Sequence, residues 1–496
     1  MSFRRLIAYN TLIQIIGKVL GVGFSLGTVI LLTRYLGVAG YGRYNTVMVF
    51  VGFFVILADL GIYKIAVREM AQNKKRQAQI LGNAFIYRIF SSLLIFVFAF
   101  LVGLLMPYEP IVKLAIGIVA IQSAASSLNI LLRSVFQVNY RMDLPTFLEI
   151  ISRGLYFALT LLAIHLKYDL LVIFWLFVIS TFFNLLLIYL LALKFTKIKL
   201  QFDKKFLRYF LKESWPLGLV AALIMINVTI GPILLSFYKS MTAMGIYGIA
   251  YRVFENLIII PFIFVDLILP RLSELYKTDR SKLKIFFQKA FDILLIVVFP
   301  VTILFFFMAP HWIYIIGGGK EFIAAYHPLR TLIFAVAAIF LSAPFANFLI
   351  ACGKQKWLIL STSLVVFLNI TLNLILIPRY SYNGVALATL IAEAVYLVVL
   401  FFLTNHLLGV KPLLSLAKKL ILPAFLIIVF LNFILSISFF SLGNFAQFNL
   451  VKQIVLVIAA FLSTGGLYIL ILLGLNIIPL NFVRALIYRE KVNGQS

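Results

Sequence analysis

Charged residues are scarce in this chain of 496 residues: Asp, Glu, Lys and Arg together make up only 12% of it. Soluble domains average about 25% charged and about 45–50% apolar residues. Here the apolar fraction is 64%, and the mean hydropathy is +1.10. A soluble core of this length could not bury so much apolar surface. The composition therefore excludes a soluble globular protein and indicates a polytopic integral membrane protein.

Cysteine is nearly absent, because Cys352 is the only one, and this excludes an internal disulfide. The four histidines have no metal-ligand spacing, and no Ser–His–Asp arrangement suggests a nucleophile. The longest loop, residues 194–214, is basic and amphipathic and predicts a surface helix rather than a catalytic domain. We therefore expect no enzyme activity, no cofactor and no metal site.

Acidic residues are also few, 16 against 43 Lys and Arg, which gives a net charge of +27. A soluble protein this basic would suggest a nucleic-acid partner. Here the cations lie in short loops beside apolar runs, where they fix topology and contact anionic lipid headgroups. The charge therefore predicts membrane lipids, and no nucleic acid, as partners.

Runs of about 20 mostly apolar residues predict membrane-spanning helices. None of the runs alternates in the way that outer-membrane strands do, so the predicted fold class is an all-α polytopic membrane protein with 14 transmembrane helices. The first run is too long for the core of a signal peptide and is predicted to be retained. The predicted spans are residues 9–32, 44–66, 82–106, 112–137, 146–165, 170–193, 215–238, 245–268, 286–310, 325–351, 357–377, 384–407, 415–436 and 450–474.

The distribution of Lys and Arg over the loops predicts the orientation of these spans. With the N-terminus inside, 27 of these residues lie on the cytoplasmic side and 8 on the opposite side. We therefore expect a multi-pass protein of the cell (plasma or inner) membrane with both termini in the cytoplasm.

Two similar phrases predict an internal repeat. "TRYLGVAGYGRYN" (33–45) and "MTAMGIYGIAYRVFEN" (241–256) superimpose when the chain is shifted by 206 residues, and both lie between apolar runs. Spans 1–6 therefore correspond to spans 7–12 in the same orientation, as in parallel-repeat transporters. The predicted domains are an N-lobe (1–200), a C-lobe (201–410), a pair of added helices (411–476) and a cytoplasmic tail (477–496). The glycines of the two phrases would let the chain turn tightly and let two helices approach closely.

Several stretches resemble the polysaccharide-biosynthesis flippases, the Wzx-type transporters of the multidrug/oligosaccharidyl-lipid/polysaccharide (MOP) superfamily. They are "LLTRYLGVAGYGRYN", "ADLGIYKIAVREMA", "MGIYGIAYR", "PRLSELYKTDRSKL", "IIGGGKEFIAAYHPLRTLIFA" and "NLILIPRYSYNGVALATLIAEAVY". The resemblance covers spans 1–12.

The resemblance implies two six-helix lobes in a V around a cationic cavity, plus two C-terminal helices. It also implies that a polyprenyl-diphosphate-linked oligosaccharide moves from the cytoplasmic to the outer leaflet by alternating access, for cell-surface polysaccharide or glycan biosynthesis. We expect a monomer, with membrane lipids and polysaccharide assembly proteins as further partners.

Ionised side chains inside a bilayer cost roughly 3 kcal/mol or more, so they are candidate functional residues. Lys18, Arg88 and Arg153 are predicted to hold the diphosphate when the cavity opens inward, and Arg252 and Arg330 to contact it nearer the exit. In the alternative, these cations pair with acids or lipid headgroups for structural reasons.

Two acids are candidates for coupling or for ion pairing. Asp59 could pair with Lys64 or Lys18, or bind a coupling cation. Glu255 lies near mid-membrane, one turn from Arg252 on the same face, and could instead carry a coupling proton. Membrane potential is a further source of driving force.

Two other functions remain open. A MATE-like multidrug or cation antiporter would use the same scaffold. A membrane glycosyltransferase or polymerase would be expected to show a large extracytoplasmic loop, and the outer loops here are short. The last two spans lack internal ionisable residues, so they could line a groove for a prenyl tail or serve packing.

Overall fold

The computed structural model describes residues 3–59, 61–201, 203–409 and 415–477. These residues form helices and no strand, which confirms the predicted all-α class. Eleven of the described helices are long and apolar enough to cross a membrane by length and composition. The chain is a multi-pass membrane protein. Its predicted cytoplasmic tail lies outside the described residues from position 478 onward.

Two helices, α1 (Phe3–Asp59) and α12 (Gln355–Leu408), are very long. Helix α12 contains the predicted spans 357–377 and 384–407, whereas α1 contains 9–32 and only the first part of 44–66, because α1 ends at Asp59 and α2 starts at Ile62. At 1.5 Å per residue, their 57 and 54 residues extend over about 80 Å, more than twice the thickness of a hydrocarbon core. Each is kinked at one residue with positive φ, Gly37 (65°) or Ser381 (51°). Glycine adopts this conformation at little cost, whereas a serine there is strained. The count of fourteen spans stays a prediction.

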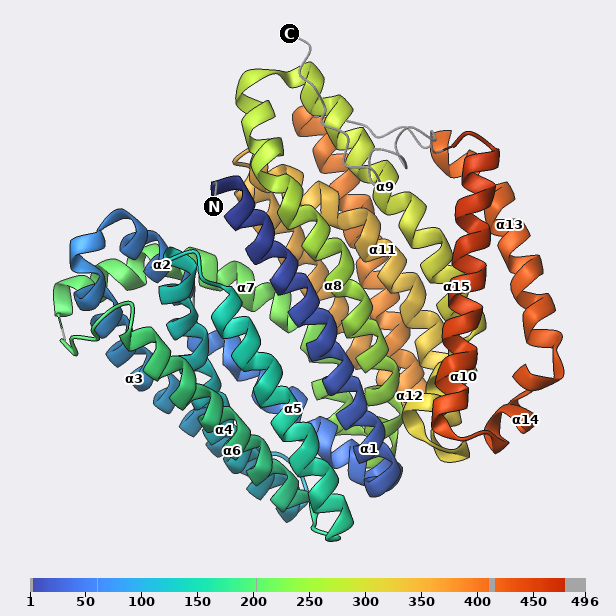
Figure 1. Cartoon of the computed structure of the whole chain (residues 1–496), viewed down its shortest axis with the longest axis horizontal. Coiled ribbons are helices and arrows are strands. Elements are labelled where there is room, and N and C mark those ends of the chain that lie inside the picture. The colour runs from blue at the N-terminus through green and yellow to red at the C-terminus, as the bar shows by residue number, and fades with distance from the viewer. Residues whose placement is uncertain (1–2, 60, 202, 410–414, 478–496) are drawn as a thin grey trace. The chain divides into compact units, whose positions relative to one another are not determined.

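The described chain divides into two compact units, and the first, unit 1, contains residues 1–249, 316–322 and 362–388. Its helices α1 to α7 are coloured blue to green in Figure 1. After α1 they are α2 (Ile62–Gln72), η1 (Lys74–Arg76), α3 (Gln77–Leu105), α4 (Pro110–Val138), α5 (Asp143–His165), α6 (Leu170–Leu193) and α7 (Lys204–Tyr238), followed by the first residues of α8 (Met241–Thr278).

The second unit, unit 2, contains residues 250–315, 323–361 and 389–496. It begins within α8 and includes part of α12. Its other elements are α9 (Arg280–Phe307), α10 (Ala309–Gly317), η2 (Lys320–Ala325, whose first residues belong to unit 1), α11 (Tyr326–Ala351), α13 (Ser415–Ser436), η3 (Ser438–Phe440), α14 (Leu442–Gln447) and α15 (Leu450–Gly474). The predicted lobe boundaries stay a prediction.

Buried polar side chains join the membrane-crossing helices of unit 1. Gln122 on α4 donates a hydrogen bond to Thr181 on α6 (3.1 Å), and Asn184 on α6 donates to the carbonyl of Leu148 on α5 (3.1 Å). In hydrocarbon, helices gain little from the hydrophobic effect, so packing and interhelical hydrogen bonds of about 0.6 kcal/mol each stabilise the bundle. These polar residues are therefore explained by the fold.

The two repeated phrases contact one another within unit 1. A Cβ on Gly42 of α1 would lie 1.8 Å from the Met241 carbonyl oxygen, and a Cβ on Gly245 of α8 would lie 2.1 Å from that of Val38. Neither position has room for a side chain. The close approach predicted for these glycines is present, and the helices that meet there are α1 and α8.

The predicted surface helix over residues 194–214 is wrong for its first half. The described residues of 194–203 are not helical, and α7 begins only at Lys204. The Lys199 backbone N–H donates to the Ala78 carbonyl (3.3 Å), and a Cβ on Gly82 would lie 1.7 Å from the Lys199 oxygen. This segment therefore lies directly on the start of α3, which an amphipathic pattern alone could not indicate.

Candidate functional site

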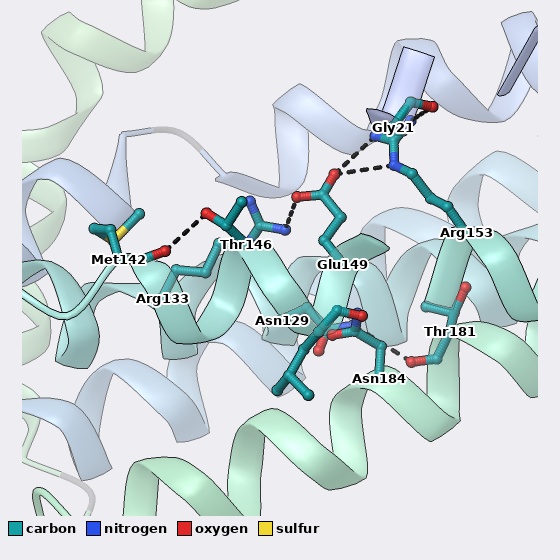
Figure 2. A network of polar contacts seen from close by, with 10 residues as sticks. Gly21, Asn129, Arg133, Met142, Thr146, Glu149, Arg153, Thr181 and Asn184 are labelled. Atoms are coloured by element: carbon teal, nitrogen blue, oxygen red, sulfur yellow. Dashed lines mark hydrogen bonds and ion pairs between the residues drawn. The ribbon is translucent and has the colours of Figure 1, made fainter. Parts of the chain in front are cut away.

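The clearest polar cluster within the membrane-crossing part of unit 1 joins Arg133 on α4 to Glu149 and Arg153 on α5, as Figure 2 shows. The Arg133 Nη2 lies 2.6 Å from one Glu149 oxygen, and the Arg153 Nη2 lies 2.7 Å from the other. Arg153 also donates through Nε to Glu149 (3.1 Å) and through Nη1 to the Gly21 carbonyl of α1 (3.2 Å). One carboxylate thus holds two guanidinium groups, and the set links three helices. We name Arg133, Glu149 and Arg153 the arginine triad.

Small residues bring α1 to the arginine triad. Gly17 and Gly21 form a G-x-x-x-G pattern, which allows close helix contact in membranes. A Cβ on Gly17 would lie 2.1 Å from the Thr146 methyl group, and one on Gly21 would lie 3.3 Å from the Arg153 side chain. Lys18 follows Gly17 directly on α1, and its side chain is exposed. Lys18 and Arg153 thus lie on two helices that pack together, and their role in binding the diphosphate stays a prediction.

The charges of this region do not cancel. The arginine triad carries two positive charges and one negative charge, and Lys18 adds a further positive charge. The side chains of the triad are 30–44% exposed, so they are reachable from outside the protein. Guanidinium groups present forked donors that match phosphate oxygens. The arrangement can therefore bind an anionic group.

Arg88 has a different environment from Lys18 and Arg153. Its side chain on α3 has an exposed fraction of 0%. It donates through Nη1 to the Ala58 carbonyl near the end of α1 (2.8 Å) and through Nε to the Ser127 carbonyl of α4 (3.2 Å). The last carbonyls of a helix have no hydrogen-bond partner within that helix, and Arg88 donates a hydrogen bond to one of them. In this conformation Arg88 contacts protein, and its role in substrate binding stays a prediction.

The two cations predicted for the exit lie in unit 2, and both have internal partners. Arg252 forms an ion pair of 3.1 Å with Glu255, three residues further along α8. Arg330 on α11 donates to the Phe306 carbonyl (3.0 Å), and its guanidinium lies 4.9 Å from the Phe306 ring centre and 5.0 Å from that of Tyr326. The expected pairing within α8 is present.

The remaining predicted site residue, Asp59, has its side chain outside the described part of the chain. Glu255 is described, and its partner is Arg252. Among the described residues, no group of three or more His, Cys, Asp or Glu could hold a metal ion.

Arg133 and Glu149 were not predicted as site residues. The i, i+4 spacing of Glu149 and Arg153 on one helix was a signal for their pairing. No signal of this kind was available for Arg133, because it reaches Glu149 from another helix, 16 residues earlier in the chain.

Comparisons with known proteins agree with the fold and the resemblance. Residues 7–276 match the family described as polysaccharide biosynthesis protein. No curated protein matches the chain. Among solved structures, the lipid II flippase MurJ in an inward closed conformation has a TM-score of 0.74 at 17% identity, over 93% of this chain and 98% of that one.

Two further solved structures show the same fold. An inward-facing multidrug resistance MATE family transporter of the MOP superfamily has a TM-score of 0.68 at 14% identity, over 80% of this chain and 95% of its own. A MOP superfamily transporter from Pyrococcus furiosus has a TM-score of 0.60 at 14% identity, over 82% of this chain and 95% of its own. The TM-scores establish a shared fold, and identities this low leave the substrate open.

Proposed function

Because this chain belongs to the polysaccharide biosynthesis protein family and has the fold of MOP transporters, we propose that it is a flippase for polyprenyl-diphosphate-linked oligosaccharides. It moves the lipid-linked glycan from the cytoplasmic to the outer leaflet of the cell membrane by alternating access. Its termini lie in the cytoplasm, in agreement with the excess of loop Lys and Arg on that side.

The observation that carries this proposal is the uncompensated positive charge beside α1 and α5. The arginine triad and Lys18 together hold three cations and one acid, and all four lie within helices of membrane-crossing length. A diphosphate carries the opposite charge, and its oxygens accept forked hydrogen bonds from guanidinium groups. In the proposed inward-open state, Lys18 and Arg153 contact the diphosphate, while Glu149 holds Arg133 and Arg153 in position.

The other predicted cations act at different steps. Arg88 positions the end of α1 through the Ala58 carbonyl. Arg252 and Arg330 contact the diphosphate nearer the exit, which requires them to exchange Glu255 and the Phe306 carbonyl for phosphate oxygens. Glu255 is then released from its ion pair, so it is a stronger candidate than Asp59 for the residue that carries a proton coupled to transport.

A multidrug antiporter is the competing function on this scaffold, since a MATE family transporter shares the fold. The charge of the candidate site favours an anionic substrate, because three cations against one carboxylate would repel a cationic drug. Transport of a fluorescent cation in place of the lipid-linked glycan would support the antiporter.

The experiment is a flipping assay in proteoliposomes. A short-chain polyprenyl diphosphate that carries a fluorescent oligosaccharide is incorporated, and its exposure on the outer leaflet is followed by quenching with a membrane-impermeant reagent. Lys18→Gln and Arg153→Gln each remove charge-assisted hydrogen bonds of about 1.5–3 kcal/mol, so we expect substrate affinity to fall roughly 10- to 150-fold. Lys289→Gln is the matched control, because Lys289 is an exposed cation on the membrane-crossing helix α9.

Flipping by Lys18→Gln and Arg153→Gln at the wild-type rate and affinity, at equal protein per vesicle, would overturn the assignment of the diphosphate site. Failure of the wild-type protein to flip any lipid-linked oligosaccharide would overturn the proposed function itself. Equal losses in the Lys289→Gln control would indicate a general effect of intramembrane charge, and this too would count against the site.

A further inference from the structure

A groove opens on the surface of unit 1 between the membrane-crossing helices α3, α4 and α6. Its volume is about 580 Å³, and carbon atoms line it almost completely. The rings of Phe96 and Phe100 on α3 and of Phe182 on α6 form part of its walls. Helix α4 packs against both α3 and α6, and the three helices lie in the same part of Figure 1. Because all three have the length and composition of membrane spans and the groove is apolar, we expect it to open toward the hydrocarbon of the membrane.

Small residues on α4 leave the groove open. Gly117, Ala120 and Ala124 line it, and their spacing of three and four residues places them on one face of the helix. A Cβ on Gly117 would lie 3.0 Å from the Phe100 ring, so larger side chains along this face would occupy the space. The concave surface is thus a property of the sequence of α4.

One end of the groove carries a positive charge. The Lys113 ammonium donates to the Leu104 carbonyl at 2.8 Å. Lys113 lies one helical turn before Gly117, and Leu104 lies one turn after Phe100, so the contact between them spans the end of the groove. An ammonium has three donors, and Leu104 takes one of them. The nearby acid Glu109 forms an ion pair of 2.8 Å with Arg43.

We propose that this groove and Lys113 form a binding site for one phospholipid with an anionic headgroup. A fatty acyl chain occupies the groove, and Lys113 binds the phosphate. The lining residues of α4 run from Leu114 to Leu128, about 20 Å along the helix, which covers the depth of one leaflet of a hydrocarbon core of about 30 Å. This length suits a single acyl chain, and a polyprenyl tail is much longer. The site is separate from the proposed diphosphate site and does not depend on the transported substrate.

Photolabelling in lipid nanodiscs tests the site. Wild-type protein is reconstituted with phosphatidylcholine and a phosphatidylglycerol that carries a diazirine in its acyl chain, and labelled residues are identified by mass spectrometry. We expect labels to concentrate on α3 and α4 residues that line the groove. The label is also expected to exceed that from a diazirine phosphatidylcholine, because Lys113 adds an attraction worth about fivefold in occupancy.

Two variants separate binding of the acyl chain from binding of the lipid headgroup. Ala124→Phe fills the groove and should abolish most of the labelling there. Lys113→Gln should leave the groove labelled but remove the preference for phosphatidylglycerol. Leu101→Phe is the matched control, because Leu101 is an exposed residue of α3 (53%) that does not line the groove.

Three outcomes would overturn the proposal. The first is labelling spread evenly over exposed positions such as Leu101. The second is unchanged labelling in Ala124→Phe, with its thermal unfolding like that of the wild type. The third is stronger labelling of the groove by a diazirine polyprenyl phosphate than by phosphatidylglycerol, which would assign the groove to the carrier lipid. Because the assay measures binding alone, a failed flipping experiment does not affect it.

Discussion

Replacing Gly42 by alanine tests the contact between the two repeated phrases. In the present structure the added Cβ would lie 1.8 Å from the Met241 carbonyl oxygen and 3.0 Å from the Gly245 nitrogen. Both obstacles are backbone atoms of α8, which cannot rotate away as a side chain could. The helices α1 and α8 must therefore separate at this point.

The size of the effect follows from the distances. Carbon and oxygen atoms approach to about 3.3 Å even in weak hydrogen bonds, so the helices must move apart by about 1.5 Å. Overpacking of a well-packed site costs about 1–3 kcal/mol, and a backbone obstacle puts Gly42→Ala at the upper end. A loss of about 3 kcal/mol lowers the population of the close-packed conformation roughly 150-fold relative to others. Gly23→Ala is the control on the same helix, because a Cβ there would meet nothing within 4 Å.

Disulfide trapping measures the close-packed conformation directly. Thr46 Oγ1 lies 3.4 Å from Met241 Sδ, so Thr46→Cys with Met241→Cys, in a Cys352→Ala background, reports on contact between α1 and α8. We expect rapid oxidative cross-linking in the Gly23→Ala protein and at least tenfold slower cross-linking in Gly42→Ala. Equal cross-linking rates and equal thermal stability in the two variants would refute the reasoning from this contact.

Three other substitutions have defined expectations. Glu149→Gln weakens the hydrogen bonds of two arginines and should cost about 2 kcal/mol in thermal unfolding; a stability equal to wild type would contradict the arginine triad. Burial lowers the pKa of His311, which lies on α10 and donates to the Phe440 carbonyl, so the unfolded chain binds a proton more readily. Stability should therefore fall as pH drops below about 6.5, and this dependence should weaken in His311→Gln when melting temperatures at pH 7.5 and 5.5 are compared. Glu213 and Glu69 accept hydrogen bonds from Arg68 and raise its pKa. Because the pair of Arg68 and Glu213 is exposed, Glu213→Gln should lower the free energy of unfolding by under about 1 kcal/mol in the same thermal unfolding assay.

The positions of the spans were predictable from the sequence because hydropathy is a local property. Each predicted run from 82–106 to 170–193 coincides with one helix from α3 to α6. A span needs about twenty apolar residues whatever surrounds it, since backbone groups in hydrocarbon must be satisfied within the helix. The class, the helical fold and the family followed from this pattern and from short motifs.

The environments of the intramembrane charges depended on the tertiary structure. Arg88 and Arg153 looked alike in the sequence, at similar depths in spans 3 and 5. In the fold, Arg88 is buried against the carbonyls of Ala58 and Ser127, whereas Arg153 is 44% exposed in the arginine triad. Depth along a helix can be counted from the sequence, but which face meets which neighbouring helix cannot.

The same limit applies to the repeated glycines. The sequence alone marked Gly42 and Gly245 as positions where helices could approach, because only glycine leaves a helix surface without a side chain. It did not determine that these two positions meet each other. Contacts between residues about two hundred positions apart arise when the helices pack, since close packing selects the partner whose shape fits each surface.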